Sequence, residues 1–330
     1  MLSQVDTRTA TFAEALREAL REEMERDPRV FLMGEDIGRH GGIFKVTAGL
    51  REAFGPERVR DTPISELGIT AAGVGAALTG MRPVVEIMFG DFITLAMDQI
   101  VNNAAKARYM LGGQVSVPIT FRTTLGTARS AAAQHSQSLH AWFCHIPGLK
   151  VVIPSSPADA KGLLKTAIRD DNPVLFFEDK ILYNRSDVLP DRDDCIPFGQ
   201  ASVVRCGSDV TVIATARMVG LALAAAEKLA QEGIDVEVVD PRTLVPLDAD
   251  TLISSAIKTK RVIVLDQGCL RYGVTGEIAA TIYDAAFDYL DAPIRRLAAR
   301  QVPIPFSPAL EQAVLPTEQH LIEEIRRLVT

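Results

Sequence analysis

The chain has 330 residues, of which 47% are hydrophobic and 23% charged, so it is long enough and apolar enough to form two ordinary domains. This composition excludes a disordered or fibrous protein. The formal net charge is −7 with no compensating basic block, so the chain lacks the positive surface that binding to DNA or RNA requires. We therefore expect no nucleic-acid partner.

The N-terminal residues contain neither a basic segment nor an apolar segment of the kind that directs export. No uncharged stretch is long enough to span a bilayer, so we expect no membrane partner and a cytoplasmic location. The cysteines lie far apart in the sequence and form no C-x-x-C pair, which is typical of reduced thiols. They are Cys144, Cys195, Cys206 and Cys269.

Strand-like and helix-like stretches alternate through the first half of the chain. Apolar spacing predicts a helix over 11–26, a buried strand over 30–33, a glycine-containing loop over 34–42, a helix that starts at Glu66, a strand over 83–88 and a helix over 92–110. Further strands are expected over 117–121, 150–153 and 174–177. This alternation predicts an α/β fold with a parallel sheet and helices on both faces.

Residues 186–200 are rich in aspartate and proline, which indicates a linker between two domains, 1–185 and 201–330. The second domain is predicted to be a smaller α/β unit. Its strands are expected over 210–214, 236–239, 261–265 and 294–297, and its helices over 221–231 and 276–289. Pro303, Pro305 and Pro308 predict an extended segment before a final helix near 318–328.

Glu66 is the first candidate for a chemical role. The sequence DTPISE over 61–66 is followed by the small-residue run LGITAAGVGAA, which puts Glu66 at the start of a helix after a strand and a turn. Open α/β sheets bind ligands at such positions, because backbone donors and the positive end of the helix converge there. The alternative is a first-turn glutamate that only the helix dipole favours.

Two other kinds of site are less well supported. Residues 73–78 resemble a G-x-G-x-x-G dinucleotide motif, but Leu78 occupies the third glycine position and the glycines lie inside the predicted helix. His135, His140 and His145 recur at five-residue intervals, which would place them on different faces of a helix and does not favour a metal cluster. A loop histidine such as His135 could instead transfer protons near neutral pH.

A set of motifs in a fixed order then points to one family. The motifs are MGEDIG at 33–38, GGIFKVT at 41–47, DTPISE at 61–66, DQI at 98–100, HSQS at 135–138, IPGLKVV at 146–152, DAKGLL at 159–164, VDPRTL at 239–244 and YLDAP at 289–293. Over essentially the whole chain, the sequence resembles the beta subunits of thiamine-diphosphate-dependent 2-oxo acid dehydrogenases, the pyruvate, branched-chain and acetoin type.

This resemblance implies a transketolase-like pyrimidine-binding domain followed by a smaller, transketolase-like C-terminal domain. It implies a heterotetramer of two alpha and two beta chains with a beta–beta contact, and a thiamine diphosphate shared between alpha and beta. The sequence has no Gly-Asp-Gly motif followed by an asparagine pair, which would hold a magnesium diphosphate. The resemblance assigns that part of the site to the alpha subunit, so the isolated chain is expected to be inactive.

The activity that the resemblance implies is oxidative decarboxylation of a 2-oxo acid, with transfer of the acyl group to a lipoyl group on an acyltransferase core. Two alternatives remain open. One is an acetoin-cleaving or carboligating enzyme with the same cofactor, and the other is a non-catalytic scaffold subunit of the same fold. The segment 124–133 departs from the family pattern, since Thr124 replaces a proline and 127–133 contains no glycine, and this leaves the identity of the oxo acid open.

The resemblance also assigns roles to individual residues. Glu66 matches the glutamate that hydrogen-bonds N1′ of the aminopyrimidine, and Glu35 matches a second acidic position near the cofactor. Phe92 matches an aromatic residue beside the ring, although a core phenylalanine would fit the sequence equally well. His135 matches a histidine at the active-site entrance that assists acyl transfer.

Glu66 is further expected to be buried among apolar neighbours. Ile64, Leu67 and Ile69 are the candidates, and their surroundings would favour the protonated carboxyl that this role requires.

Some family members hold a structural potassium ion with backbone carbonyls and an aspartate. The equivalent positions here are Ile119, Ala167, Ile168, Asp170 and Asn172. Such hard oxygen ligands suit this ion. The alternative is an ordinary helix C-terminus, whose last carbonyls lack partners within the helix.

Overall fold

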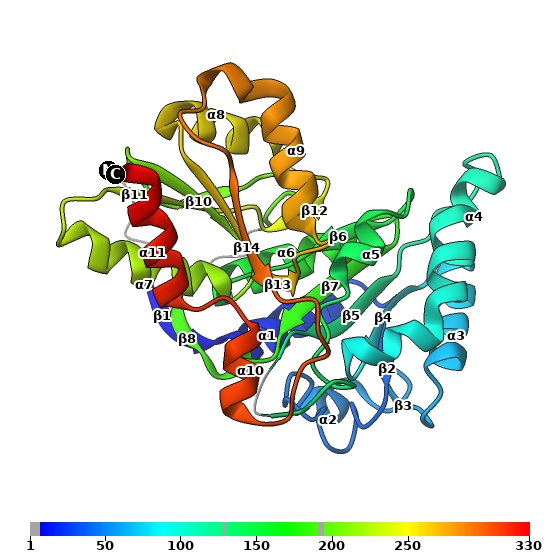
Figure 1. The fold of residues 1–330 in the computed structure, drawn as a ribbon. Helices are drawn as coiled ribbons and strands as arrows, with labels where there is room; N and C mark the ends of the chain where they lie inside the picture. The colour runs from blue at the N-terminus through cyan, green and yellow to red at the C-terminus, as the bar shows by residue number, and fades with distance from the viewer. Residues whose placement is uncertain (1–6, 128–129, 191–194) are drawn as a thin grey trace, which may run out of the picture. The chain divides into compact units, whose positions relative to one another are not determined.

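The structure is a computed structural model that describes residues 7–127, 130–190 and 195–330. The chain divides into two compact units, each with its own sheet (Figure 1). Unit 1 comprises Met1–Leu125 and Trp142–Phe198, and unit 2 comprises Gly126–Ala141 and Gly199–Thr330. Residues 126–141, which the sequence places inside the first domain, therefore belong to unit 2.

The sheet of unit 1 is parallel, as predicted. Its strands follow one another in the order β6 (Lys150–Val152), β7 (Val174–Asp179), β5 (Thr120–Leu125), β4 (Arg82–Ile87), β2 (Val30–Gly34) and β3 (Val59–Asp61). Every residue of β2, β5 and β7 is buried, which is the pattern of a sheet covered on both faces.

Helices α1 (Phe12–Arg26) and α6 (Pro157–Arg169) pack together and share an apolar core with one face of this sheet. Thr11 caps the N-terminus of α1 and forms a capping box with Glu14. Helix α3 (Glu66–Leu78) packs against β4, where a Cβ on Gly73 would lie only 2.6 Å from the side chain of Val85. Glycine at this position therefore allows helix and strand to approach closely.

The continuous helix predicted over 92–110 is wrong. The chain instead forms a 3₁₀-helix η1 (Gly90–Ala96), a π-helix η2 (Asp98–Ala104) and a short α-helix α4 (Ala105–Met110). The side chain of Asn103 donates to both the backbone oxygen and the carboxylate of Asp98 at 3.2 Å. Such side-chain bonds across five residues compete with the regular ladder of an α-helix.

The first residues of the predicted linker are a strand. β8 (Ser186–Pro190) pairs antiparallel with β1 (Thr7–Thr11), and neither strand was predicted. Residues 191–194 of that linker lie outside the described residues. Unit 1 also contains α2 (Leu50–Phe54) and η3 (Leu182–Asn184), and α5 (His140–Cys144) begins in unit 2 and ends in unit 1.

The sheet of unit 2 has the strand order β14 (Arg295–Ala299), β13 (Val262–Cys269), β10 (Val210–Ala214), β11 (Val236–Asp240) and β9 (Ser202–Arg205). Among these five strands, all within the described residues, β9 alone runs antiparallel to its neighbour, β11. Helices α7 (Met218–Ala230) and α11 (Glu318–Val329) pack on one face, and α8 (Ala249–Thr259) and α9 (Val274–Ala286) pack together on the other (Figure 1).

The strand order of unit 2 reverses direction at β10. The chain passes from β10 through α7 to β11 on one side, whereas β13 pairs with the other side of β10. The carboxyl ends of β10 and β13 therefore form a topological switch point, which is the usual position of a ligand in an open α/β sheet.

The remaining elements of unit 2 are short: β12 (Thr243–Val245), η4 (Phe287–Tyr289) and α10 (Pro308–Val314). The expectation that Pro308 belongs to an extended segment is wrong, because this proline begins α10 after Ser307. Proline suits the first turn of a helix, where its missing N–H is not needed. Within the described ranges, no helix has both the length and the apolar character needed to cross a membrane.

Candidate functional site

Glu66 is the first residue of α3 and follows β3 after a short turn. The backbone N–H of Thr62 donates to the oxygen of Gly34 at 3.0 Å, which holds this turn against the end of β2. Glu66 therefore lies beside the carboxyl edge of the sheet, at the positive end of a helix. Only 8% of the residue is exposed.

Glu35 lies close to Glu66. It follows directly after β2, and its carboxylate accepts a hydrogen bond from the backbone N–H of Ser65, the residue that precedes α3. Its atom Oε1 is buried, and no described residue supplies a hydrogen bond to it. Burial, followed by the nearby charge of Glu66, raises the pKa of the Glu35 carboxyl. The structure thus brings together two carboxylates that the sequence separates by 30 residues.

The apolar surroundings expected for Glu66 are only partly present. Ile69 is buried, but 83% of Ile64 and 49% of Leu67 are exposed. The expectation is wrong for these two residues because both lie on the solvent-facing side of the turn and first helical residues. The second carboxylate, rather than an apolar pocket, is the distinctive neighbour of Glu66.

Phe92 belongs to a group of aromatic rings in unit 1. It lies in η1 and makes an edge contact with Phe89, with ring centroids 6.2 Å apart. Phe89 contacts Phe44 at the same centroid separation, and Phe44 stacks on Tyr183 at 4.4 Å. Phe92 is half-buried, so it is not a fully enclosed core residue. Since η1 packs against α3, Phe92 and Glu66 lie on neighbouring elements.

A buried charge network lies in the central strands and was missed in the sequence. The guanidinium of Arg122 on β5 donates to both oxygens of Glu178 on β7, at 2.7 and 2.8 Å, and to Glu86 on β4 at 2.7 Å. Tyr183 donates its hydroxyl to Glu178 at 2.7 Å. A charged residue within an otherwise apolar strand was the available signal, as in PVVEIM, TFRTT and LFFED.

Burial is the main influence on these groups. It raises the pKa of Glu178, although Arg122 acts in the opposite direction. Burial opposes the charge of Arg122, yet the two glutamates keep the pKa of its guanidinium above the ordinary value. The network therefore contains a permanent cation between two carboxyl groups. Its residues line a small cavity together with Gly42 and Phe44 of the loop that follows β2.

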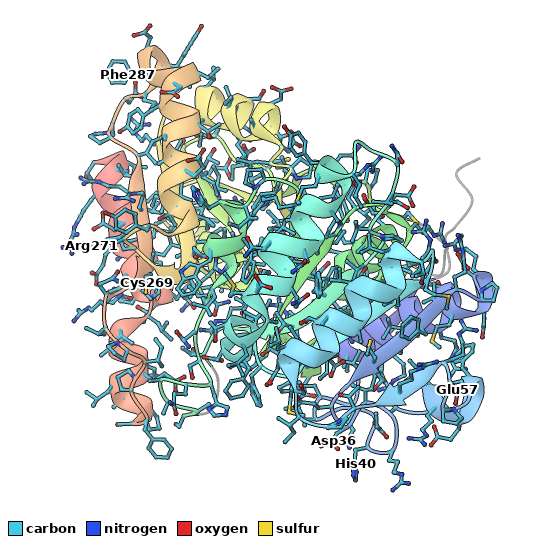
Figure 2. The ribbon with its side chains drawn as sticks, turned by 90° about the vertical axis from the view of Figure 1, so that its right-hand side faces the viewer. Asp36, His40, Glu57, Cys269, Arg271 and Phe287 are labelled. Atoms are coloured by element: carbon cyan, nitrogen blue, oxygen red, sulfur yellow. The ribbon has the colours of Figure 1, made fainter. Side chains whose placement is uncertain are left out.

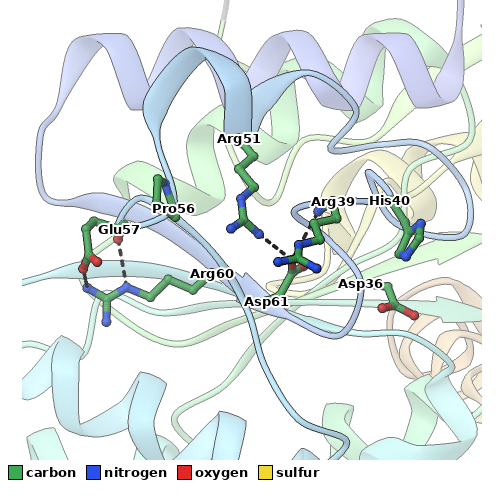
Figure 3. Close-up of a pocket in the computed structure, with 8 residues that line it drawn as sticks. All are labelled: Asp36, Arg39, His40, Arg51, Pro56, Glu57, Arg60 and Asp61. Carbon is green, nitrogen blue, oxygen red and sulfur yellow. Dashed lines mark hydrogen bonds and ion pairs between the residues drawn. The ribbon is translucent and has the colours of Figure 1, made fainter.

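An open cleft of about 570 Å³ lies beside the ends of β2 and β3 (Figure 3). It is lined by Asp36, Arg39, His40, Arg51, Pro56, Glu57, Arg60 and Asp61. Asp61 accepts hydrogen bonds from the backbone N–H groups of Gly38 and Arg39 and from Arg51, the last at 2.6 Å. Figure 2 shows Asp36 and His40 close together at the surface. The balanced charges of this cleft favour no single ligand.

His135 lies in unit 2, whereas Glu35, Glu66 and Phe92 lie in unit 1. It is half-buried in a segment whose turn is closed by a bond from the backbone N–H of Gly126 to the oxygen of Gln137, at 3.1 Å. The structure therefore brings the two carboxylates together, puts Phe92 on an adjoining element and places His135 in the other unit. Two residues of the same segment, 128 and 129, lie outside the described residues.

The five positions predicted for potassium adjoin one another at the C-terminal end of α6 and the start of β5. The oxygen of Ile119 accepts from Val174, and the oxygens of Ile168 and Asp170 accept from the guanidinium of Arg82 at 3.1 and 3.0 Å. Lys150 pairs with the Asp170 carboxylate. A carbonyl oxygen has two lone pairs, so these oxygens could still bind a metal cation. The side chains of Arg82 and Lys150 already supply positive charge to the same group of oxygens.

Comparison with known proteins gives matches over both units. The family model "Transketolase, pyrimidine binding domain" matches residues 8–186, and the model "Transketolase, C-terminal domain" matches residues 199–321. Among solved structures, the chain is similar to "Split gene transketolase, inactive beta4 tetramer", with a TM-score of 0.79 and 21% identity over 97% of this chain and 98% of the other. This likeness supports the fold.

Curated relatives are similar over almost the whole chain. The pyruvate dehydrogenase E1 component subunit beta of Rickettsia felis is 50% identical over 318 residues, which cover 96% of this chain and 98% of the relative. The mitochondrial pyruvate dehydrogenase E1 component subunit beta-1 of Arabidopsis thaliana is 47% identical, over 96% of this chain and 88% of the relative. The acetoin:2,6-dichlorophenolindophenol oxidoreductase subunit beta of Bacillus subtilis is also 47% identical, over 96% of each. This chain belongs to the family of the beta subunits of thiamine-diphosphate-dependent 2-oxo acid dehydrogenases, with transketolase pyrimidine-binding and C-terminal domains.

Proposed function

We propose that this chain is the beta half of a 2-oxo acid dehydrogenase that decarboxylates its substrate oxidatively and transfers the acyl group to a lipoyl group. The observation that supports this most directly is the pair of carboxylates, Glu35 and Glu66, at the start of α3. When bound, thiamine diphosphate supplies the carbon centre that accepts the oxo acid and stabilises the charge left by decarboxylation.

The residues present fit the pyrimidine end of that cofactor. Glu66 would share a proton with N1′ of the ring, which is the act of a general acid or base placed at one atom. The buried Oε1 of Glu35 would accept a hydrogen bond from a nearby donor. Phe92 would offer an apolar face. His135 would assist acyl transfer at the entrance to the site.

An alpha subunit is the proposed partner, in a heterotetramer of two alpha and two beta chains. The sequence has no Gly-Asp-Gly motif followed by an asparagine pair, so the alpha subunit would hold the magnesium diphosphate. The solvent-facing side of α3 contains Gly68, Ala72 and Gly75, whose small side chains would let another helix approach closely at the beta–beta contact. A lipoyl acyltransferase core is the proposed acceptor of the product.

The test is reconstitution of this chain with its alpha subunit. Glu66→Gln should lower the oxo acid–dependent reduction of a dye by about a hundredfold or more, because it removes a positioned proton carrier. Glu25→Gln changes an exposed glutamate on α1 and should have no effect. Full activity of Glu66→Gln would contradict the assignment and favour a scaffold role, and turnover by the isolated beta chain would contradict the shared site.

An acetoin-cleaving enzyme is the second candidate, supported by the Bacillus subtilis relative. Assays with pyruvate, branched-chain 2-oxo acids and acetoin would identify the substrate. Stable binding of a lipoyl acyltransferase to the assembled tetramer, with acylation of its lipoyl group, would favour the dehydrogenase. Cleavage of acetoin without such binding would favour the alternative.

We also propose potassium at the oxygen donors near Asp170. The test compares thermal unfolding of the assembled complex in potassium chloride and in choline chloride at equal ionic strength. A bound ion raises the melting temperature as its concentration exceeds the dissociation constant. Equal melting temperatures over the whole range would show that Arg82 and Lys150 suffice at this position.

A further inference from the structure

The described residues of the segment 126–141, which are 126–127 and 130–141, contact the switch point of unit 2 at both ends. The segment follows β5 of unit 1 but belongs to unit 2, and it meets the ends of β10 and β13. We propose that His140 and Asp266 form a clamp that positions this segment, and with it His135, against the carboxyl end of β13. The catalytic consequence rests on the role proposed above for His135.

The clamp is a buried contact between an imidazole and a carboxylate, with further hydrogen bonds to the same carboxylate. Atom Nε2 of His140 lies 3.2 Å from Oδ2 of Asp266, and both side chains are essentially inaccessible to solvent. The other carboxylate oxygen accepts from the hydroxyl of Thr215, which follows β10. Oδ2 also accepts from the backbone N–H of Gly268 at 2.8 Å. A buried charge is retained only with such partners, so each oxygen of Asp266 has a defined position.

The electrostatics agree with this geometry. Burial would raise the pKa of Asp266, but His140, Thr215 and Gly268 together hold it below the ordinary value. These partners therefore favour the charged form of the Asp266 carboxyl.

Contacts with side chains of unit 2 hold the beginning of the same segment. A Cβ on Gly126 would lie 2.2 Å from the side chain of Gln267, the residue after Asp266, and Gly126 has a φ of +83°. Arg217, which precedes α7, donates to the oxygen of Thr127 at 3.0 Å and to its hydroxyl at 2.8 Å. Both ends of the segment are thus attached to the switch point.

This attachment determines where His135 lies. His135 is five residues before His140, and its own stretch contains no helix or strand. At the carboxyl ends of β10 and β13, where other open α/β sheets bind a ligand, Asp266 contacts His140 of the same chain. Unit 2 would therefore act as a support for His135, with His140 and Asp266 as positioning residues that contact neither substrate nor cofactor.

Hydrogen–deuterium exchange of the assembled complex tests the clamp without measuring activity. His140→Ala should speed exchange of the amides of 130–139 by about tenfold or more, because the segment loses its buried attachment and opens locally. His140→Gln keeps a donor toward Asp266 and should restore most of the protection. Asp266→Asn is the second variant, and it should also speed exchange.

Thr211→Val is the matched control. Thr211 lies in β10, at the opposite end of the strand from Thr215, and its hydroxyl bonds to Ser255 and Thr259 at 3.1 and 2.8 Å. Its replacement should perturb the sheet and leave exchange of 130–139 unchanged. Unchanged exchange in both His140→Ala and Asp266→Asn would overturn the clamp. An increase in Thr211→Val equal to that in these two variants would also overturn it.

Kinetics then test its consequence for His135. In the assembled complex, His140→Ala should lower the acylation rate of a lipoyl domain by about tenfold, since small displacements of a reacting group are costly, and His140→Gln should recover it. The dye-linked rate should change by less than about twofold. Equal losses in both assays would overturn the positioning role. If His135→Ala itself acylates the lipoyl domain normally, the role proposed for His135 is wrong, while the exchange experiment still decides the clamp.

Discussion

Arg122→Met should destabilise unit 1 strongly. The guanidinium is 2% exposed and forms a fork with Glu178, which is 1% exposed, in addition to its bond with Glu86. Removal of the cation leaves a buried carboxylate without its main partner, and breaking such a pair costs about 3–5 kcal/mol. This is a large part of the total stability of an ordinary domain.

The chain offers a convenient probe for this measurement. Trp142 is the single tryptophan and belongs to unit 1, so its fluorescence during urea unfolding reports that unit. Arg60→Met is the control, because Arg60 pairs with Glu57 at 3.2 Å in the same unit and the two side chains are 51% and 88% exposed. The control should lose at most about 1 kcal/mol. The double variant with Glu178→Gln should recover part of the loss.

The loss in Arg122→Met should also depend on pH. Burial already raises the pKa of Glu178, and the guanidinium is the main group that opposes this shift. Without it, the folded-state pKa rises further above the unfolded value, so the stability of the folded state falls as the pH rises through this range. The destabilisation should be larger at about pH 8 than at about pH 5. A loss below about 1 kcal/mol, or one independent of pH, would refute the reasoning.

Two further predictions concern α3 and its first turn. Gly73→Ala should lower the free energy of unfolding by about 1–3 kcal/mol, since the new methyl group would lie 2.6 Å from the side chain of Val85. Gly75→Ala adds a methyl group that faces open space, so it should raise the free energy of unfolding by up to about 1 kcal/mol. Equal urea midpoints for the two variants would contradict this packing. Glu35→Gln should stabilise the chain at neutral pH but not in acid. The pKa of Glu35 is raised in the folded state, so the unsubstituted chain loses stability as the pH rises and the glutamine variant does not. Identical profiles of melting temperature against pH for the two proteins would count against a close approach of Glu35 to Glu66.

The sequence predicted the regular part of unit 1 well because that part depends on local patterns. Buried parallel strands are short continuous apolar runs, and the runs at 30–33, 83–88 and 174–177 are all strands in the structure. The 92–110 helix failed because the bonds of Asn103 to Asp98 act against a regular helix, and no apolar periodicity reveals such bonds. Strands β1 and β8 were missed because neither contains an apolar run.

In the candidate site too, features that depend on neighbouring residues were predicted and features that depend on distant residues were not. The position of Glu66 after a strand and a turn was confirmed, because the motif is contiguous in the sequence. The apolar neighbours expected from Ile64 and Leu67 were wrong, because adjacency in sequence does not fix the direction in which a turn exposes its side chains. The buried partners of Arg122 depend on β5 lying between β4 and β7, which no local pattern specifies.

By itself, the sequence determined the α/β class, the parallel sheet, the order of the motifs and the family, since each of these is a property of residues that are neighbours in the chain or follow a short period. Only the tertiary structure decided that Glu35 lies near Glu66, that Arg122 lies between two glutamates and that residues 126–141 belong to unit 2. The physical reason is that these contacts join residues far apart in the sequence, and their free energy depends on strand order and burial, which arise only when the whole chain folds.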